Sequence, residues 1–326
     1  MENLLNMKNK TLLILFFLSV CLIVNSAIPW GFFVHKRVNK YAVFTLPEEL
    51  IGFYKKNIDY IEEHSVDPDK RRYAVKEEAP RHYIDIDHYG ENPFESMPRK
   101  WNDAVEKFSE DTLQSYGIVP WYIQTTYNRL VYAFIDKDSD KILKYSADLG
   151  HYIADAHVPL HTTVNYNGQL TGQKGIHAFW ESRLPELFSE DYDYLVGTAQ
   201  YKYSVLDFAW ETIEASHNAL DSVLNFDKIL AESYDSDKQY SYEKRGSKTI
   251  NVRSEGYSDA YHVMLDGMVE RRMRKTILSI GSLWYSAWVD AGQPILDGMK
   301  NSSTPFTEKI KIDHKITKDD ARGHQH

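Results

Sequence analysis

The stretch SADLGHYIADAHVPLH, residues 146–161, is the most informative part of the sequence for predicting the fold. Its apolar residues recur with helical spacing, and His151 and Asp155 lie four residues apart. Side chains at that spacing share one face of a helix. A helix is therefore predicted over 139–156, and Pro159 closes it, because proline cannot continue a helix.

A second pair with the same spacing follows at once. It is His177-Ala-Phe-Trp-Glu181, and His161 stands between the two pairs, where the proline can turn it back toward the first. Imidazole and carboxylate groups suit zinc, which takes nitrogen and oxygen ligands at about 2.0–2.2 Å. The absence of thiolates favours a hydrolytic zinc site over a structural one. His157 is interpreted as a solvated or core histidine in preference to an extra ligand.

Helical spacing dominates the rest of the chain as well. Further helices are predicted over 36–60 with an interruption near Pro47, and over 102–116, 121–136, 206–224 and 259–291. The stretches 162–176 and 234–254 are rich in Gly, Asn and Tyr and are predicted as loops. No run shows the sustained alternation of a β-strand. The sequence predicts an all-α fold, a single compact multi-helix domain over residues 30–300.

The composition fits a globular enzyme. Hydrophobic residues make up 43% of the 326 residues, which is enough for a sizeable core. A formal net charge of -9 argues against binding nucleic acid through a broad basic face. A nuclease is not excluded, because bound zinc brings positive charge to the site itself.

The N-terminus has the pattern of a secretory signal peptide. Lys8 and Lys10 precede an apolar run over 11–24 that is too short to span a bilayer, and small or polar residues follow it. The only cysteine, Cys21, lies inside this run, so the mature chain has no disulfide. Residues 1–29 are predicted to be a signal peptide with a short pre-segment, which implies a secreted or periplasmic protein. An uncleaved membrane anchor is the alternative, and residues 301–326 are predicted to form a polar tail.

Weaker signals lie upstream. Asp67 sits fifteen residues before His82, in a stretch that by itself is most often a turn. The residues after His82, which include Tyr83 and Asp85, alternate between polar and apolar and are compatible with a short half-buried strand. Trp30, soon after the signal segment, would by itself be a packing anchor.

Taken together, these pieces resemble the superfamily of zinc-dependent phospholipases C and fungal-type single-strand-specific nucleases. The resemblance runs from residue 30 to about residue 185. It rests on nine positions in the family's order, which are Trp30, His35, Asp67, His82, His151, Asp155, His161, His177 and Glu181. The spacing alone favours Asp67 over Asp69.

The resemblance implies an all-α fold with three zinc ions in a cleft. One ion would be held by Asp67, His82, His151 and Asp155, and a second by His161, His177 and Glu181. Trp30, through its α-amino group and carbonyl, and His35 would hold the third, with Asp155 bridging it to the first. Asp67 would also be the general base, and a zinc-activated hydroxide would attack phosphorus.

The basic residues after Asp67 and the residues ahead of Trp30 also affect the chemistry. Lys70, Arg71 or Arg72 could place a cation over the phosphate, although a solvated basic turn explains them equally well. A cut after Ala27 would leave Ile-Pro ahead of Trp30, so the third ion requires cleavage directly before Trp30 or later removal of the dipeptide.

The substrate is open between two branches of this superfamily. Glu181 and the lack of cysteines favour a phospholipase C-like phosphodiesterase, whereas Phe33 stands where a choline-recognising phospholipase would have an acidic residue. A nuclease and 3'-nucleotidase is the alternative, in which Tyr83 and Asp85 would bind a base. The expected partner is thus a phospholipid or single-stranded nucleic acid, with no obligate protein partner. A non-catalytic metal-binding surface protein is a third, less favoured reading.

Overall fold

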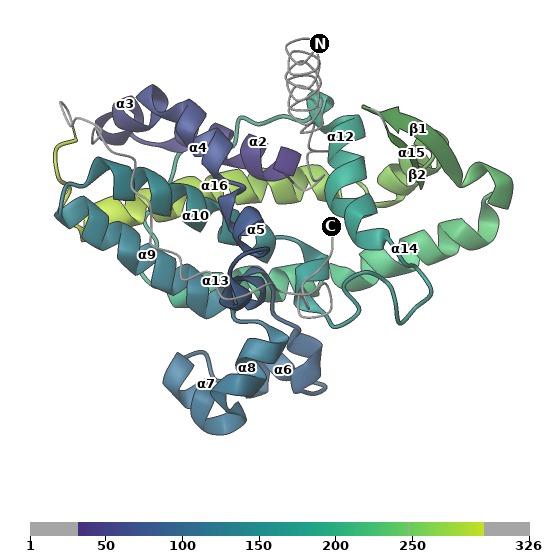
Figure 1. Cartoon of the computed structure of the whole chain (residues 1–326), viewed down its shortest axis with the longest axis horizontal. Coiled ribbons are helices and arrows are strands. Elements are labelled where there is room, and N and C mark those ends of the chain that lie inside the picture. Colours follow the sequence, from purple (N-terminus) through teal and green to yellow (C-terminus); the bar gives the residue numbers. More distant parts are fainter. Residues whose placement is uncertain (1–31, 247, 297–326) are drawn as a thin grey trace, which may run out of the picture.

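The computed structural model describes residues 32–246 and 248–296. These residues are mainly helical, and their one sheet has two strands. Figure 1 shows the long helices running across the molecule, with shorter helices above and below them. The prediction of a compact all-α domain is confirmed. The predicted signal segment 1–29, Trp30 and the tail 301–326 lie outside the described residues.

Helix α10 (Ser139–Ala156) is the centre of the fold. The side chain of Asp138 caps its first turn by accepting a hydrogen bond of 3.1 Å from Lys141 N. Every residue from Ser146 to Ala156 is buried, so this half of the helix is covered on all sides. The long helices packed around it are α2 (Phe32–Ala42), α9 (Val119–Ile135), α13 (Val205–His217) and α16 (Met268–Asp290).

Aromatic side chains fix α10 to its neighbours. Tyr54 of α3 (Glu48–Lys56) and Trp284 of α16 stack with their ring centroids 4.9 Å apart. The hydroxyl of Tyr54 lies 2.8 Å from Ser146 Oγ, and the indole Nε1 of Trp284 donates to the Ser146 carbonyl at 2.9 Å. Three helices are thereby joined at one residue of α10.

Helix α2 crosses α10 at Gly150. A Cβ atom there would lie 1.8 Å from Asn39 Oδ1, so this close approach requires glycine. Asn39 Nδ2 in turn donates to the carbonyl of His35 at 2.9 Å. At this crossing the rings of His35 and His151 stack with centroids 4.0 Å apart. The glycine therefore sets the distance between two of the predicted zinc ligands.

Further helices, most of them short, complete the chain on either side of α10. Before it lie η1 (Val43–Thr45), α4 (Ile58–His64), α5 (Asp67–Arg71), η2 (Lys76–His82), η3 (Ile86–Tyr89), α6 (Pro93–Ser96), α7 (Trp101–Phe108) and α8 (Glu110–Tyr116). After it lie η4 (Pro159–Thr162), α11 (Ile176–Ala178), η5 (Phe179–Arg183), α12 (Leu184–Phe188), η6 (Ser189–Asp191), α14 (Leu220–Ser233), η7 (Ser236–Lys238) and α15 (Glu255–Met264).

The helix predictions are largely confirmed, with several corrections. The helix predicted over 102–116 is two helices, α7 and α8, which meet at Ser109, where φ is positive. The helix predicted over 259–291 is two helices, α15 and α16, because the chain turns through positive φ angles at Asp266 and Gly267. The region after residue 206 likewise divides into α13 and α14. The short strand considered after His82 does not form, since residues 83–85 belong to no helix or strand and the 3-10 helix η3 begins at Ile86. None of the described helices combines the length and the apolar content that a membrane span requires.

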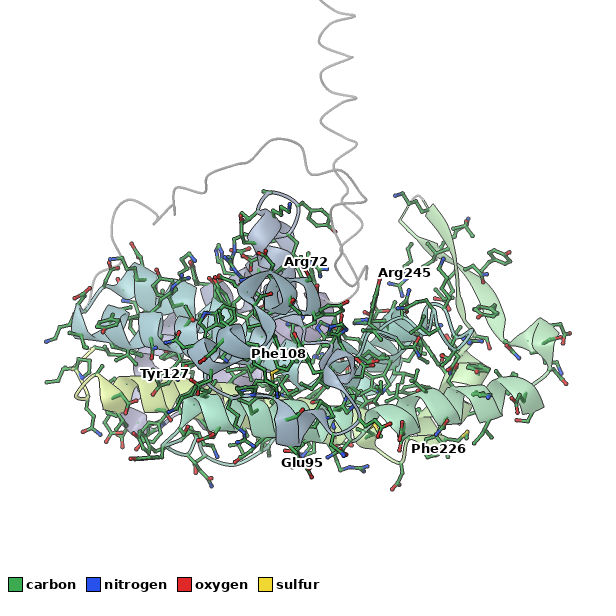
Figure 2. The ribbon with its side chains drawn as sticks, turned by 90° about the horizontal axis from the view of Figure 1, so that it is seen from below. Arg72, Glu95, Phe108, Tyr127, Phe226 and Arg245 are labelled. Atoms are coloured by element: carbon green, nitrogen blue, oxygen red, sulfur yellow. The ribbon has the colours of Figure 1, made fainter. Side chains whose placement is uncertain are left out.

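The predicted loop over 234–254 contains an antiparallel hairpin of β1 (Tyr240–Arg245) and β2 (Lys248–Arg253). Figure 2 shows it standing out from the helical body. Its exposed and half-buried residues alternate along β1, but most of them are polar. The hairpin is joined to η5 by an ion pair between Arg183 and Glu243. In this pair Arg183 Nη1 donates a 3.0 Å hydrogen bond to Glu243 Oε2.

Candidate metal centre

Helix α10 presents His151 and Asp155 on one face, as predicted from their spacing. His151 Nε2 lies 3.3 Å from Asp155 Oδ2. The ring is held by its other nitrogen, Nδ1, which lies 2.8 Å from the carbonyl oxygen of Ser65 and donates to it. A histidine fixed in this way directs the lone pair of Nε2 toward a metal ion.

His82, at the end of η2, completes this first group. Its Nδ1 lies 3.0 Å from His151 Nε2 and 2.9 Å from Asp155 Oδ2. Two ring nitrogens facing each other at this distance must share a proton or a cation. His82, His151 and Asp155 are all buried and bring their ligand atoms within 4.8 Å of one another.

A second group consists of His161, His177 and Glu181. His161 enters from η4, the short helix after Pro159, and donates from Nδ1 to the carbonyl of His82 at 2.6 Å. Its Nε2 lies 3.1 Å from His177 Nε2, which lies 2.7 Å from Glu181 Oε2. Three protein ligands of this kind are typical of a catalytic zinc ion, which keeps one position open.

His35 of α2 lies between the two groups. Its Nε2 is 3.4 Å from Asp155 Oδ1 and 3.8 Å from Glu181 Oε1. His35, Asp155 and Glu181 form a further set of converging ligand atoms. Trp30, the other residue predicted beside His35, lies outside the described residues.

The structure places one predicted ligand outside the cluster. Asp67 lies away from the histidines just described, because its carboxylate bonds to His64 at 2.6 Å and Lys70 at 2.8 Å. Asp69 instead lies beside the histidines, with Oδ1 3.8 Å from both His82 Nδ1 and His151 Nε2. Each residue of a helix is rotated by about 100° from the one before it, so two positions give about 200°. The carboxylates of Asp67 and Asp69 therefore point to nearly opposite sides of α5.

The cluster brings histidines and carboxylates of opposite charge together in a buried environment. Burial would raise the pKa of Asp155, but His151 and His161 hold it well below its ordinary value. Burial likewise opposes the charge on His151, yet Asp155 and Asp69 raise its pKa to about 9. Burial lowers the pKa of His177. The buried carboxylates are therefore stable as anions only beside positive charge. A bound divalent ion supplies this charge, and the protons on the ligand histidines are released when it binds.

The donor atoms fit zinc. All are imidazole nitrogens or carboxylate oxygens, and Asp155 Oδ1 is buried without a hydrogen-bond partner among the described residues. This atom faces His35, where a cation would satisfy both groups. The cleft predicted from the sequence is thus compatible with the observed clusters.

The residues predicted to contact substrate lie in different surroundings. Tyr83 is only 5% exposed, which leaves little of its ring for stacking on a base. Burial and then Asp87 raise the pKa of Asp85 to about 7. Lys70 is largely exposed beside Asp67.

Of the other two basic residues considered, Arg71 bonds to Asp148 at 3.1 Å and to Tyr152 OH at 3.2 Å. Arg72 lies nearest the cluster, with Nη1 3.6 Å from Asp69 Oδ1.

Sequence reasoning missed Glu78, which is fully buried on η2. It forms an ion pair with Arg71, and its Oε1 lies 3.7 Å from His82 Nε2. The carboxylate faces the Nε2 edge of the His82 ring, at a separation too long for a hydrogen bond. The i, i+4 spacing of Glu78 and His82 was the available signal. His157 bonds to Ile153 and Ser279, apart from the cluster, as expected for a core histidine.

The model of the family described as zinc-dependent phospholipase C matches residues 34–244. This chain belongs to that family. The match includes the described histidines and carboxylates of both groups, and it supports zinc dependence and hydrolysis of phosphoric esters at the level of the family. No curated protein matches the chain. Within this zinc-dependent phospholipase C family, the substrate depends on the residues around the metal cluster.

Proposed function

We propose that the chain is a secreted phospholipase C that hydrolyses the phosphodiester bond of phospholipids at a cluster of three zinc ions. The observation that carries the proposal is the buried convergence of His35, Asp155 and Glu181 with the two histidine groups. Zinc bound at such a cluster lowers the pKa of water and neutralises charge on phosphate oxygens. Family membership and the limited exposure of Tyr83 favour phospholipid over nucleic acid.

Each part of the cluster has an assigned role in this proposal. Asp69, His82, His151 and Asp155 would hold the first ion, and His161, His177 and Glu181 the second. His35 and Asp155, with the N-terminal Trp30, would hold the third. Asp69 takes over the role of proton acceptor that the sequence pattern assigned to Asp67.

Arg72 supplies the protein's own positive charge beside the cluster. Its side chain is 12% exposed, and its guanidinium lies beside Asp69. A guanidinium can bind two phosphate oxygens at once. We assign Arg72 to the substrate phosphate, in preference to the more exposed Lys70.

A side-by-side assay tests the reaction. Protein beginning at Trp30 is loaded with zinc and given phosphatidylcholine vesicles or single-stranded DNA, with and without chelator. Chelator-sensitive release of phosphorylated head group is expected, and Asp155→Asn should abolish it whereas Asp140→Asn on the same helix should not. Release of nucleotides instead would identify a nuclease, and bound zinc without any turnover would identify a non-catalytic protein.

Sequencing the N-terminus of the secreted protein tests the third ion separately. A mature chain that begins at Trp30 is expected, because only then is the α-amino group available beside His35. A start at Ile28 or earlier would defeat this part of the proposal and leave the other two ions unaffected.

A further inference from the structure

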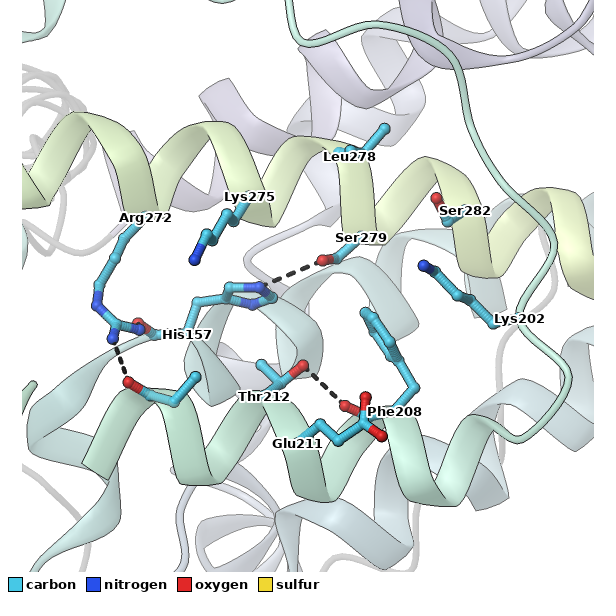
Figure 3. Close-up of a pocket in the computed structure, with 11 residues that line it drawn as sticks. His157, Lys202, Phe208, Glu211, Thr212, Arg272, Lys275, Leu278, Ser279 and Ser282 are labelled. Atoms are coloured by element: carbon cyan, nitrogen blue, oxygen red, sulfur yellow. Dashed lines mark hydrogen bonds between the residues drawn. The ribbon is translucent and has the colours of Figure 1, made fainter. Parts of the chain in front are cut away.

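A second pocket lies between α13 and α16, and no residue of the metal cluster lines it. Its volume is about 240 Å³. Figure 3 shows the side chains of Lys202 and Lys275 reaching toward the space between the two helices, with Arg272 beside Lys275. His157, two residues beyond Asp155, also lines it.

The pocket gathers positive charge in a protein of net charge -9. Three cations line it, and Glu211 is the only carboxylate among the lining residues. Neither lysine forms an ion pair with any residue that the structure describes; Lys202 Nζ instead lies 5.2 Å from the centre of the Phe208 ring. The lining residues therefore carry a charge of about +2, which suits a dianion.

Arg272 is fixed in place without a carboxylate. Its Nη1 donates to the carbonyl of His157 at 3.0 Å and to Ser216 Oγ at 2.9 Å, and Nη2 donates to the carbonyl of Ala215 at 2.5 Å. Burial, and next Arg271, lower the pKa of Arg272 to about 10. A guanidinium buried against neutral partners is stabilised by an anion brought close to it.

Apolar groups form the walls of the pocket. Phe208 and Leu278 line it, and Thr212 turns its hydroxyl away to donate to the Phe208 carbonyl at 2.8 Å. The neutral imidazole of His157 uses both nitrogens, since Nδ1 donates to Ile153 O and Nε2 accepts from Ser279. A ligand here would place an apolar body against these walls and its charge against the cations.

We propose that this pocket binds a small organic phosphate as its dianion, with the phosphate beside Lys275 and Arg272, the apolar part against Phe208, and Lys202 adding positive charge at the other end of the pocket. A carboxylate of the same shape carries one charge less and binds more weakly. Binding here requires neither the zinc cluster nor turnover, so the proposal stands apart from the phosphodiesterase reaction.

Calorimetric titration with phenylphosphonate, at a pH where it is a dianion, tests this pocket. The zinc-loaded protein and a chelator-treated sample are compared, because the metal cluster can also bind the probe. We expect one binding event that survives chelation. Lys275→Ala and Lys202→Ala should each weaken that event by at least about threefold, and Glu211→Gln should strengthen it, whereas Lys228→Ala, an exposed lysine on α14, should leave it unchanged.

Three results would overturn the proposal. They are the absence of chelator-resistant binding, chelator-resistant binding that ignores both lysine substitutions, and equal affinity for phenylacetate. The side chains of Lys202 and Lys275 form no hydrogen bond with the described residues, and the backbone bond of Lys202 N to Ser286 Oγ is kept in an alanine variant. Both variants should therefore fold normally, and the thermal unfolding midpoint checks this. Arg272 is left intact, since its loss would free the His157 carbonyl.

Discussion

His82 Nδ1 and His151 Nε2 lie 3.0 Å apart, and both nitrogens face Asp155 Oδ2. Residues 69 positions apart in the chain thus present their rings to one buried carboxylate. Two nitrogens in this arrangement need a proton or a metal ion between them. The same relationship recurs between His161 and His177 beside Glu181, so the fold builds two such centres side by side.

The two carboxylates of α5 should behave differently on substitution. Asp69→Asn should lower bound zinc and phosphodiesterase activity by at least about tenfold, because it removes a charged oxygen facing His82 and His151. Asp67→Asn should leave both within about twofold, since its partners His64 and Lys70 lie outside the cluster. Zinc analysis and initial rates of the paired variants check this, and the opposite ranking would restore the spacing-based choice of Asp67.

Gly150→Ala should disturb the metal centre from a distance. The new methyl group would overlap Asn39 Oδ1 and push α2 away from α10, which separates His35 from His151. We expect a loss of about 1–3 kcal/mol in the free energy of unfolding, together with weaker zinc binding. Gly52→Ala on α3 is the matched control, because nothing lies within 4 Å of its added Cβ, and it should be neutral or stabilising. Equal effects of the two substitutions would contradict the role of the crossing.

Arg72→Ala should lower the rate of phosphodiester hydrolysis by about tenfold or more, because the substrate phosphate loses a cation. Zinc content should stay nearly constant, since arginine is not a ligand. Lys70→Ala should change neither property, as its ammonium is paired with Asp67 and largely exposed. Steady-state kinetics with zinc analysis separates the two variants, and a slower Lys70→Ala with a normal Arg72→Ala would reverse the assignment.

The cap of α10 should contribute pH-dependent stability. Although burial opposes it, hydrogen bonds from Lys141 lower the pKa of Asp138. A carboxylate with a lowered folded pKa stabilises the protein above its unfolded pKa of about 3.9, and the contribution is lost as the pH falls through the folded value. Asp138→Ala should therefore cost about 1 kcal/mol near neutral pH and less in acid. Urea unfolding of metal-free protein checks this, with Asp136→Ala as the control; a cost independent of pH would argue against the charged cap.

Local spacing predicted the part of the site that lies on continuous helix. The four-residue spacing was enough to predict that His151 lies beside Asp155 and His177 beside Glu181. Pro159 was enough to predict that the chain turns and brings His161 back toward the first pair. Asp69 could not be chosen in this way, because its direction depends on where α5 begins and on the partners that hold Asp67 outward. The all-α class followed similarly from helical periodicity.

Features made by tertiary contacts were beyond local patterns. The hairpin in residues 240–253 has mostly polar residues on both faces, so alternation of hydrophobicity did not reveal it, and its pairing with Arg183 depends on the assembled fold. The pocket between α13 and α16 joins residues from 157 to 282. No motif in the sequence places Lys202 near Lys275.

Zinc titration of chelator-treated protein tests whether hydrolysis depends on zinc held by the buried carboxylate of Asp155. Metal-free wild type and Asp155→Asn are titrated with zinc while hydrolysis of a phosphodiester is followed. We expect wild type to regain activity as it binds zinc. Asp155→Asn, which lacks the carboxylate shared by His35, His82 and His151, should stay inactive and bind less zinc. Full activity without zinc, or undiminished activity and zinc binding in Asp155→Asn, would contradict this dependence.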